Sequence, residues 1–132
     1  MTLSPSKKPL AGRQLLVVED EVFVAMLIED VVEGAGGAVI GPAARVDEAL
    51  ALLEAQKPDG ALLDVNLGGE LVYPVAEALA RRRIPFVFVT GYGPEGIAAP
   101  FKGRPTIKKP FLPSAFVTQV ASGLAGGEIA DG

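Results

Sequence analysis

The sequence has no cysteine and no histidine, and these two absences exclude several kinds of chemistry. Without cysteine there is no disulfide, no thiol nucleophile and no thiolate metal site. Without histidine there is no imidazole general base, no serine–histidine–aspartate triad and no histidine-bound zinc. Carboxylate, lysine, threonine and backbone groups must therefore carry any reaction.

Long apolar segments and extensive basic surfaces are also lacking. No run of about 18 apolar residues, the length needed to cross a bilayer, occurs in the sequence, and residues 1–12 lack the apolar stretch of a signal peptide. The formal net charge of −4 argues against a nucleic-acid partner, because phosphate binding needs a basic face. The short basic clusters at residues 7–8 and 81–83 are interpreted as solvated surface. We therefore expect a cytoplasmic protein with no membrane or nucleic-acid partner.

What the chain does contain is a regular alternation of strand-like and helix-like segments. Its 132 residues suit one domain, and 49% hydrophobic residues suffice for a folded core. Short apolar runs, typical of strands buried on both faces of a parallel sheet, predict strands at residues 14–18, 38–40, 60–64, 85–90 and 106–108. Apolar residues at helical spacing and helix-start signals predict helices at residues 22–33, 48–56, 70–82 and 114–124. The pattern predicts an α/β fold with a doubly wound five-stranded parallel sheet, and we take the strand order as 2-1-3-4-5.

Residues 91–105 interrupt this alternation. The stretch holds four glycines and three prolines, which disfavour a full helix. We expect a loop with at most one helical turn around residues 95–99, so that the fourth helix is short or replaced by a loop. Residues 13–125 then form the folded domain, between flexible tails at residues 1–12 and 126–132.

Polar side chains follow four of the five predicted strands at their carboxyl ends, where open α/β sheets bind ligands. Glu19 and Asp20 follow the first strand and Asp64 ends the third. Thr90 ends the fourth strand and Lys109 follows the fifth. In the order 2-1-3-4-5 the first and third strands are neighbours, so the three carboxylates converge in one pocket.

Three carboxylates close together repel one another, and a hard cation removes that cost. Oxygen-only ligands indicate Mg²⁺, with Mn²⁺ or Ca²⁺ as possible substitutes. An aspartate at a strand end can also act as a nucleophile and form an acyl phosphate, while a metal, the Lys109 ammonium and the Thr90 hydroxyl neutralise the phosphoryl oxygens.

Each of these residues alone has an ordinary structural interpretation. Asp20 can cap the following helix, Asp64 and Thr90 precede turns, and a lysine before a proline carries little information. Their joint placement at neighbouring strand ends favours one phosphoryl-transfer site.

Four segments together resemble the receiver domain of two-component response regulators. They are LLVVEDE at residues 15–21, ALLDVN at 61–66, FVTG at 88–91 and KKPF at 108–111, and the resemblance covers about residues 13–124. It implies the flavodoxin-like (CheY-like) fold. It also implies a phosphoacceptor, Asp64, assisted by Thr90 and Lys109, and a Mg²⁺ site formed by Glu19, Asp20, Asp64 and the backbone carbonyl of Asn66. Lys109 is preferred over Lys108 because the pleat of the sheet points Lys108 away, and the resemblance implies a cis peptide bond between Lys109 and Pro110.

The segment that switches in such receivers departs from the usual pattern. Thr106 stands where most receivers carry a switch aromatic residue, three positions before the lysine. The sequence PFVFVTGYG at residues 85–93 resembles instead the single-domain subfamily named for its FATGUY motif, with Val89 in place of alanine. In this sequence Tyr92 follows Gly91 directly. We therefore place the switch at Gly91, Tyr92 and Thr106.

The resemblance implies a stand-alone regulator rather than an enzyme. Its expected partner is a histidine kinase or a histidine phosphotransfer protein, and its output is either protein contact or a role as phosphate relay or sink. Two alternatives stay open: a degenerate receiver that binds partners without phosphate, and a phosphohydrolase with an aspartate nucleophile. The second resembles the haloacid dehalogenase group, whose Asp-x-Asp arrangement and cap do not occur in this sequence. Glycine-rich nucleotide-binding motifs are also lacking.

Overall fold

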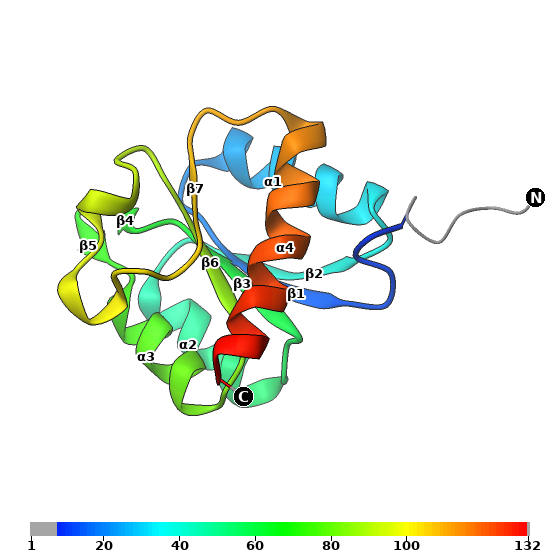
Figure 1. The fold of residues 1–132 in the computed structure, drawn as a ribbon. Coiled ribbons are helices and arrows are strands. Elements are labelled where there is room, and N and C mark those ends of the chain that lie inside the picture. Colours follow the sequence, from blue (N-terminus) through cyan, green and yellow to red (C-terminus); the bar gives the residue numbers. More distant parts are fainter. Residues whose placement is uncertain (1–7, 132) are drawn as a thin grey trace, which may run out of the picture.

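The computed structural model describes residues 8–131, and these form one parallel sheet covered by helices on both faces (Figure 1). The five long strands are β1 (Gln14–Val18), β2 (Ala38–Ala43), β3 (Gly60–Leu63), β6 (Phe86–Thr90) and β7 (Thr106–Lys108). The sheet order is β2-β1-β3-β6-β7, which confirms the predicted order 2-1-3-4-5 and the flavodoxin-like fold.

Two helices cover each face of the sheet. The helices are α1 (Val22–Gly34), α2 (Val46–Ala55), α3 (Tyr73–Arg81) and α4 (Pro113–Asp131). Helix α1 packs beside α4 on one face, and α2 packs beside α3 on the other (Figure 1). No helix among residues 8–131 is long and apolar enough to cross a membrane.

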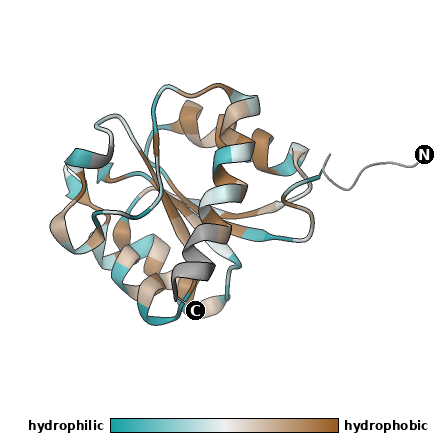
Figure 2. Cartoon of the chain, in the orientation of Figure 1, coloured by the Kyte–Doolittle hydropathy of each residue, from teal (hydrophilic) through white to brown (hydrophobic). Residues whose placement is uncertain are grey.

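The apolar strands are buried on both sides, as their sequence predicts. Leu16 and Leu63 belong to the core under α2 and α3, while the alternate residues Leu15 and Leu62 belong to the core under α1 and α4. Figure 2 shows the hydrophobic colour concentrated on the strands at the centre of the molecule. Since both faces are occupied by packing, the exposed strand ends are the part of the sheet that remains available for chemistry.

The segment at residues 91–105 contains two short 3₁₀ turns, η2 (Pro94–Gly96) and η3 (Ala99–Phe101). The expectation of a missing fourth helix is confirmed, but there are two turns rather than at most one. The segment is also anchored: Ile97 and Phe101 are buried, and the Tyr73 hydroxyl accepts a hydrogen bond from the Ala98 N–H at 2.9 Å. The Tyr73 ring stacks on Phe101 at 5.6 Å between centroids.

Three other expectations need correction. Residues 66–71, predicted as a loop and the start of a helix, form a small hairpin of β4 (Asn66–Leu67) and β5 (Glu70–Leu71). Residues 8–12 are not simply a flexible tail, since Leu10 is buried and its N–H donates to the Ala35 carbonyl at 2.9 Å. Helix α4 continues to Asp131, past its predicted end at Leu124. Residues 1–7 and 132 of the expected tails lie outside the described residues.

Candidate functional site

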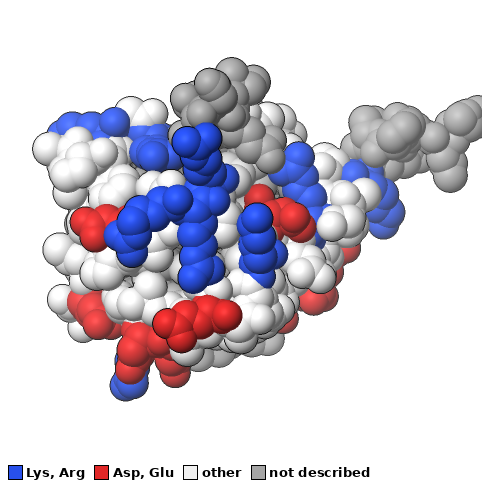
Figure 3. All heavy atoms as spheres, turned by 90° about the horizontal axis from the view of Figure 1, so that it is seen from below, with Lys and Arg blue, Asp and Glu red and all other residues white. Residues whose placement is uncertain are grey.

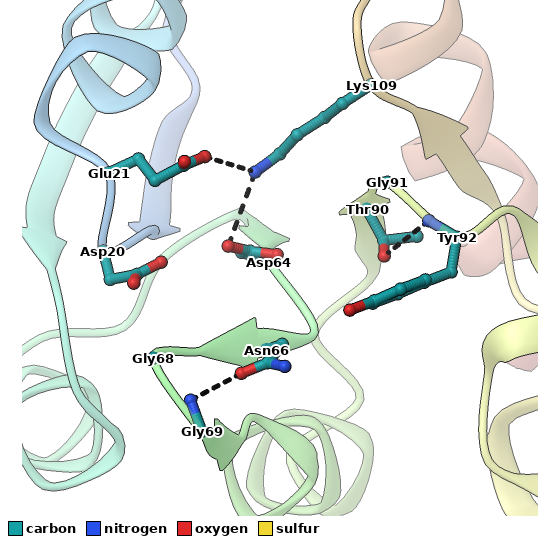
Figure 4. A pocket seen from close by; sticks show the side chains of 10 residues that line it. All are labelled: Asp20, Glu21, Asp64, Asn66, Gly68, Gly69, Thr90, Gly91, Tyr92 and Lys109. Atoms are coloured by element: carbon teal, nitrogen blue, oxygen red, sulfur yellow. Dashed lines mark hydrogen bonds and ion pairs between the residues drawn. The ribbon is translucent and has the colours of Figure 1, made fainter.

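A hollow of about 460 Å³ lies at the carboxyl ends of β1, β3, β6 and β7 (Figure 4). The residues that line it are Asp20, Glu21, Asp64, Asn66, Gly68, Gly69, Thr90, Gly91, Tyr92 and Lys109. Seven of the residues expected at the site are therefore in one place, and Glu19 lies directly behind them in contact with Lys109. The parallel order of the strands is what brings together side chains far apart in the sequence.

The three predicted carboxylates form one cluster. Strands β1 and β3 pair in parallel with Val18 opposite Leu63, so the acids that follow each strand emerge side by side. One carboxylate oxygen from each of Glu19, Asp20 and Asp64 lies within 4.8 Å of the others. Glu19 is 3% exposed and Asp64 is 7% exposed, so two of the three charges are largely withdrawn from water. An oxygen-only donor set at this spacing suits a hard divalent cation.

Lys109 is the cation that the protein itself supplies to this cluster. Its Nζ lies 2.9 Å from Glu19 Oε1, 3.4 Å from Asp64 Oδ2 and 3.6 Å from Glu21 Oε1. Strand pairing sets this position, because the Lys109 N–H donates to the Thr90 carbonyl at 2.8 Å. Lys108 is exposed and does not line the hollow, as the pleat predicts. The peptide bond from Lys109 to Pro110 is cis, which confirms that expectation.

The pKa values of Asp64 and Lys109 are both raised by their surroundings in the cluster. Burial and the neighbouring Glu19 carboxylate raise the pKa of Asp64 from 3.8 to about 7, although Lys109 opposes the shift. Burial lowers the pKa of Lys109, but its contacts with Glu19 and Asp64 outweigh this and raise the pKa overall. One lysine therefore does not neutralise the cluster, and the carboxyl of Asp64 is left with a surplus of negative charge around it. A divalent cation at the three carboxylates would remove that surplus.

Thr90 connects the cluster to the segment that follows β6. The residue is 1% exposed, and its Oγ1 accepts a hydrogen bond from the Tyr92 N–H at 3.2 Å. The Tyr92 side chain is 61% exposed, and Figure 4 shows its ring at the mouth of the hollow. A displacement of the Thr90 hydroxyl would thus change its hydrogen bond with the Tyr92 N–H.

The β4–β5 hairpin supplies part of the site that the sequence prediction missed. Its turn residues Gly68 and Gly69 have φ of +68° and +103° and line the hollow below Asp20 and Asp64. Asn66 Oδ1 accepts a hydrogen bond from the Gly69 N–H at 2.6 Å, which fixes the turn. Two adjacent glycines between short strands are a recognised hairpin signal and could have revealed it. Glu21 was also missed, because nothing in the sequence shows that Lys109 reaches it.

Thr106 is the one predicted switch residue that the structure places elsewhere. It pairs with Phe88, two residues before Thr90, and lies outside the hollow. Its hydroxyl donates to the Arg104 carbonyl at 3.1 Å. Thr106 therefore has no contact with the acidic cluster.

Known protein families and curated proteins match the chain over most of its length. The family model described as response regulator receiver domain matches residues 15–121. The phyllosphere-induced regulator PhyR of Methylorubrum extorquens is 35% identical over 114 residues, which are 80% of this chain and 42% of PhyR. The transcriptional regulatory protein PdtaR of Mycobacterium tuberculosis is 31% identical over 81 residues, 61% of this chain and 40% of PdtaR. The chain thus spans less than half the length of these curated relatives.

Solved structures agree with both the fold and the sequence match. SdrG from Sphingomonas melonis Fr1 is 40% identical with a TM-score of 0.74, covering 92% of this chain and 98% of SdrG. PhyR from Brucella abortus is 33% identical with a TM-score of 0.80, covering 96% of this chain and 53% of PhyR. The receiver domain of PhyR from Erythrobacter litoralis has a TM-score of 0.78 at 27% identity, covering 87% of this chain and 92% of that domain.

Proposed function

The chain belongs to the response regulator receiver family, and we propose that it accepts a phosphoryl group on Asp64 from a histidine kinase or a histidine phosphotransfer protein. The observation that carries this proposal is the position of Asp64. Its carboxylate lies in an open hollow, beside two further acids and 3.4 Å from the Lys109 ammonium. That combination provides a nucleophile together with the means to neutralise an incoming phosphoryl group.

In the proposed reaction an Asp64 carboxylate oxygen attacks phosphorus while the bond from phosphorus to the donor imidazole nitrogen breaks. The imidazole leaves with the bonding electron pair and is protonated by water. Lys109 attracts a phosphoryl oxygen, and the Thr90 hydroxyl, which lines the same hollow, donates to another. An attacking carboxylate has no proton to lose, so the transfer needs no general base and depends on position and charge.

The carboxylates of Glu19, Asp20 and Asp64 and the backbone carbonyl of Asn66 are the groups that would hold Mg²⁺, with Mn²⁺ or Ca²⁺ as substitutes. The raised pKa of Asp64 and the spacing of the three carboxylates fit such an ion. When bound, the ion would neutralise charge on the phosphoryl oxygens. The fold holds the carboxylates of Glu19, Asp20 and Asp64 close together, and the bound ion would offset the repulsion between them.

We propose that the response to phosphorylation passes through Thr90 and the segment from Gly91 to Gly103. The phosphoryl group draws in the Thr90 hydroxyl, so the hydrogen bond to the Tyr92 N–H is altered and the segment reorders. Because Ile97 and Phe101 are buried, the change should be largest between Gly91 and Gly96. Amide NMR spectra with and without beryllofluoride test this, and unchanged signals throughout the segment contradict it.

The signal would leave the protein through contact with a partner, or the protein would pass the phosphoryl group on as a relay or sink. Two other functions make different predictions. A phosphate-independent interaction module would bind its partner equally well after Asp64→Asn. A phosphohydrolase with an aspartate nucleophile would turn over a chromogenic phosphate ester many times, whereas the proposed receiver gives almost none.

The proposal is tested by incubating the protein with acetyl phosphate and following its intact mass. We expect gain of one phosphoryl group in the presence of Mg²⁺, much slower gain with chelator, and none for Asp64→Asn. Asp30→Asn is the matched control, because Asp30 is an exposed carboxylate on α1 that does not line the hollow. Equal labelling of wild type and Asp64→Asn would refute the assignment.

A further inference from the structure

Three consecutive arginines, Arg81, Arg82 and Arg83, lie at the end of α3, and all three are exposed. The chain then enters β6, whose opposite end carries Thr90 at the acidic hollow. Lys57 precedes the neighbouring strand β3, and Arg104 precedes β7 on the other side of β6. Five basic residues therefore gather at the amino ends of three adjacent strands, and we refer to Lys57, Arg81, Arg82, Arg83 and Arg104 as the basic patch.

Arg83 has a backbone conformation that normally selects glycine. Its φ is +59°, the only positive value at a non-glycine residue in the described part of the chain. The hydrogen bonds around it define the usual helix-ending motif: the Arg83 N–H donates to the Ala80 carbonyl and the Ile84 N–H donates to the Leu79 carbonyl, both at 3.0 Å. Glycine adopts this conformation without strain, whereas a residue with a β-carbon does not. An arginine at this position thus carries a backbone cost, and its exposed side chain has no ion pair among the side chains of residues 8–125.

Two members of the patch have structural partners, and the others have none among the side chains of residues 8–125. Arg82 donates to the Leu53 carbonyl at the end of α2, and the Arg104 guanidinium lies 4.8 Å from the centre of the Phe86 ring. Among the side chains of residues 8–125, every ion pair involves Arg45 or Lys109. Within that part of the chain no carboxylate neutralises Arg81, Arg83 or Lys57.

Figure 3 views the molecule from below and shows several lysine and arginine side chains on this face, with acidic side chains between some of them and along the lower edge. Lys57 and Arg82 line a common hollow together with Glu54. The chain as a whole carries a net charge of −4, so a long polyanion such as a nucleic acid would be repelled beyond the patch. A short acidic segment fits better, since guanidinium groups bind carboxylates in a planar, two-point geometry.

We propose that the basic patch docks a short acidic segment of a partner protein, at the end of the sheet opposite the acceptor hollow. This inference does not rest on phosphorylation of Asp64, and the unphosphorylated protein should bind. Arg81 and Arg83 provide guanidinium groups that have no ion pair among the side chains of residues 8–125, Lys57 adds charge, and Arg82 and Arg104 are held in place by the fold.

The test measures the affinity of a fluorescein-labelled oligoglutamate peptide at low ionic strength. The binding variant is Arg81→Gln combined with Arg83→Asn, because asparagine tolerates the left-handed conformation. The control is Arg45→Gln, an exposed arginine that already pairs with Asp47 at 3.1 Å. We expect the double variant to bind about tenfold more weakly, the size of effect that two lost exposed charge contacts produce, and the control to bind like wild type.

Absence of binding by the wild-type protein, or an equal loss in the double variant and in Arg45→Gln, would overturn the proposal. Tighter binding of polyuridylate RNA than of oligoglutamate would also overturn it in favour of a nucleic-acid surface. Urea unfolding supplies a second criterion. Arg83→Asn alone should unfold at the same or a higher urea concentration than wild type, and a lower midpoint would show that Arg83 has a structural role instead.

Discussion

Replacing Asp64 by asparagine should stabilise the protein when divalent cations are removed. The substitution keeps the shape of the side chain and removes one of three clustered negative charges. In the folded protein, burial and Glu19 raise the pKa of Asp64 from 3.8 to about 7, so ionising this group opposes folding. An ionised Asp64 should therefore lower the free energy of unfolding when no cation is bound. This is expected of a site that binds a cation and a phosphoryl group.

The size of the effect follows from that pKa. A rise from 3.8 to about 7 corresponds to about 4 kcal/mol at neutral pH, at roughly 1.4 kcal/mol for each pKa unit. That pKa already includes the attraction to Lys109, and because the hollow is open to water we halve the value to about 2 kcal/mol. This is a measurable fraction of the stability of an ordinary domain.

The sign of the pH dependence is also determined. Because the pKa of Asp64 is higher in the folded protein than in the unfolded chain, the wild type has its full stability from this group below about pH 4 and loses it as the pH rises through about 7. Asp64→Asn does not titrate there. The difference between variant and wild type should therefore be small near pH 4 and should grow to a plateau near pH 8.

Urea unfolding followed by circular dichroism, in chelator and across this pH range, measures the difference. Mg²⁺ should stabilise the wild type more than Asp64→Asn, because an ion that binds only the folded state adds to stability. Added Mg²⁺ should therefore reduce or reverse the stability difference between the variant and the wild type. Asp30→Asn, on an exposed carboxylate, should change stability by less than about 0.5 kcal/mol at every pH. An Asp64→Asn variant that is less stable than wild type at pH 8 in chelator, or a difference independent of pH, would refute the reasoning.

Further substitutions examine the contacts around the site and the packing beneath it. Lys109→Met should lower the free energy of unfolding at pH 8 by about 2–3 kcal/mol, because it leaves the buried Glu19 without its cation at 2.9 Å. An equal loss when Lys109→Met is made in a Glu19→Gln background would contradict this electrostatic cause. Tyr73→Phe should lower the free energy of unfolding by about 1 kcal/mol and speed hydrogen exchange at the Ala98 amide. The substitution removes only the hydrogen bond, while the stack on Phe101 remains. Unaltered exchange would show that the bond does not anchor the segment. Gly123→Ala should lower the free energy of unfolding by about 1–3 kcal/mol, because the added carbon would lie 2.8 Å from Val87 Cγ2. Gly34→Ala should be neutral or stabilising, because nothing lies within 4 Å of the added carbon. Equal effects of the two substitutions in thermal unfolding would contradict the packing argument.

The sheet and most of the site could be predicted because they depend on strong local signals. The strands are uninterrupted apolar runs, and parallel order alone places the residues at their carboxyl ends along one edge of the sheet. Asp64, Thr90 and Lys109 can be found in this way. The roles of these residues, as opposed to their positions, remain predictions that the experiments above address.

The β4–β5 hairpin has a local glycine signal, but other missed features could not be found from a local pattern. Leu10 lies in a short segment between Pro9 and Gly12, and only the folded structure shows that it is buried and bonded to the end of α1. Helix α4 continues past residue 124 despite two adjacent glycines, which weak intrinsic preferences alone would not allow. The assignment of Thr106 depends on its distance from Lys109 in sequence, but the register of β7 places it beside Phe88, away from the hollow.

The central claim is that Asp64 itself carries the phosphoryl group, and trapping the acyl phosphate tests it most directly. After reaction with a phosphorylated histidine phosphotransfer protein and Mg²⁺, borohydride reduction converts the phosphorylated aspartate to homoserine, which peptide mass mapping locates. We predict homoserine at position 64 alone. Modification at Glu19, Asp20 or another acid with position 64 intact would contradict the account.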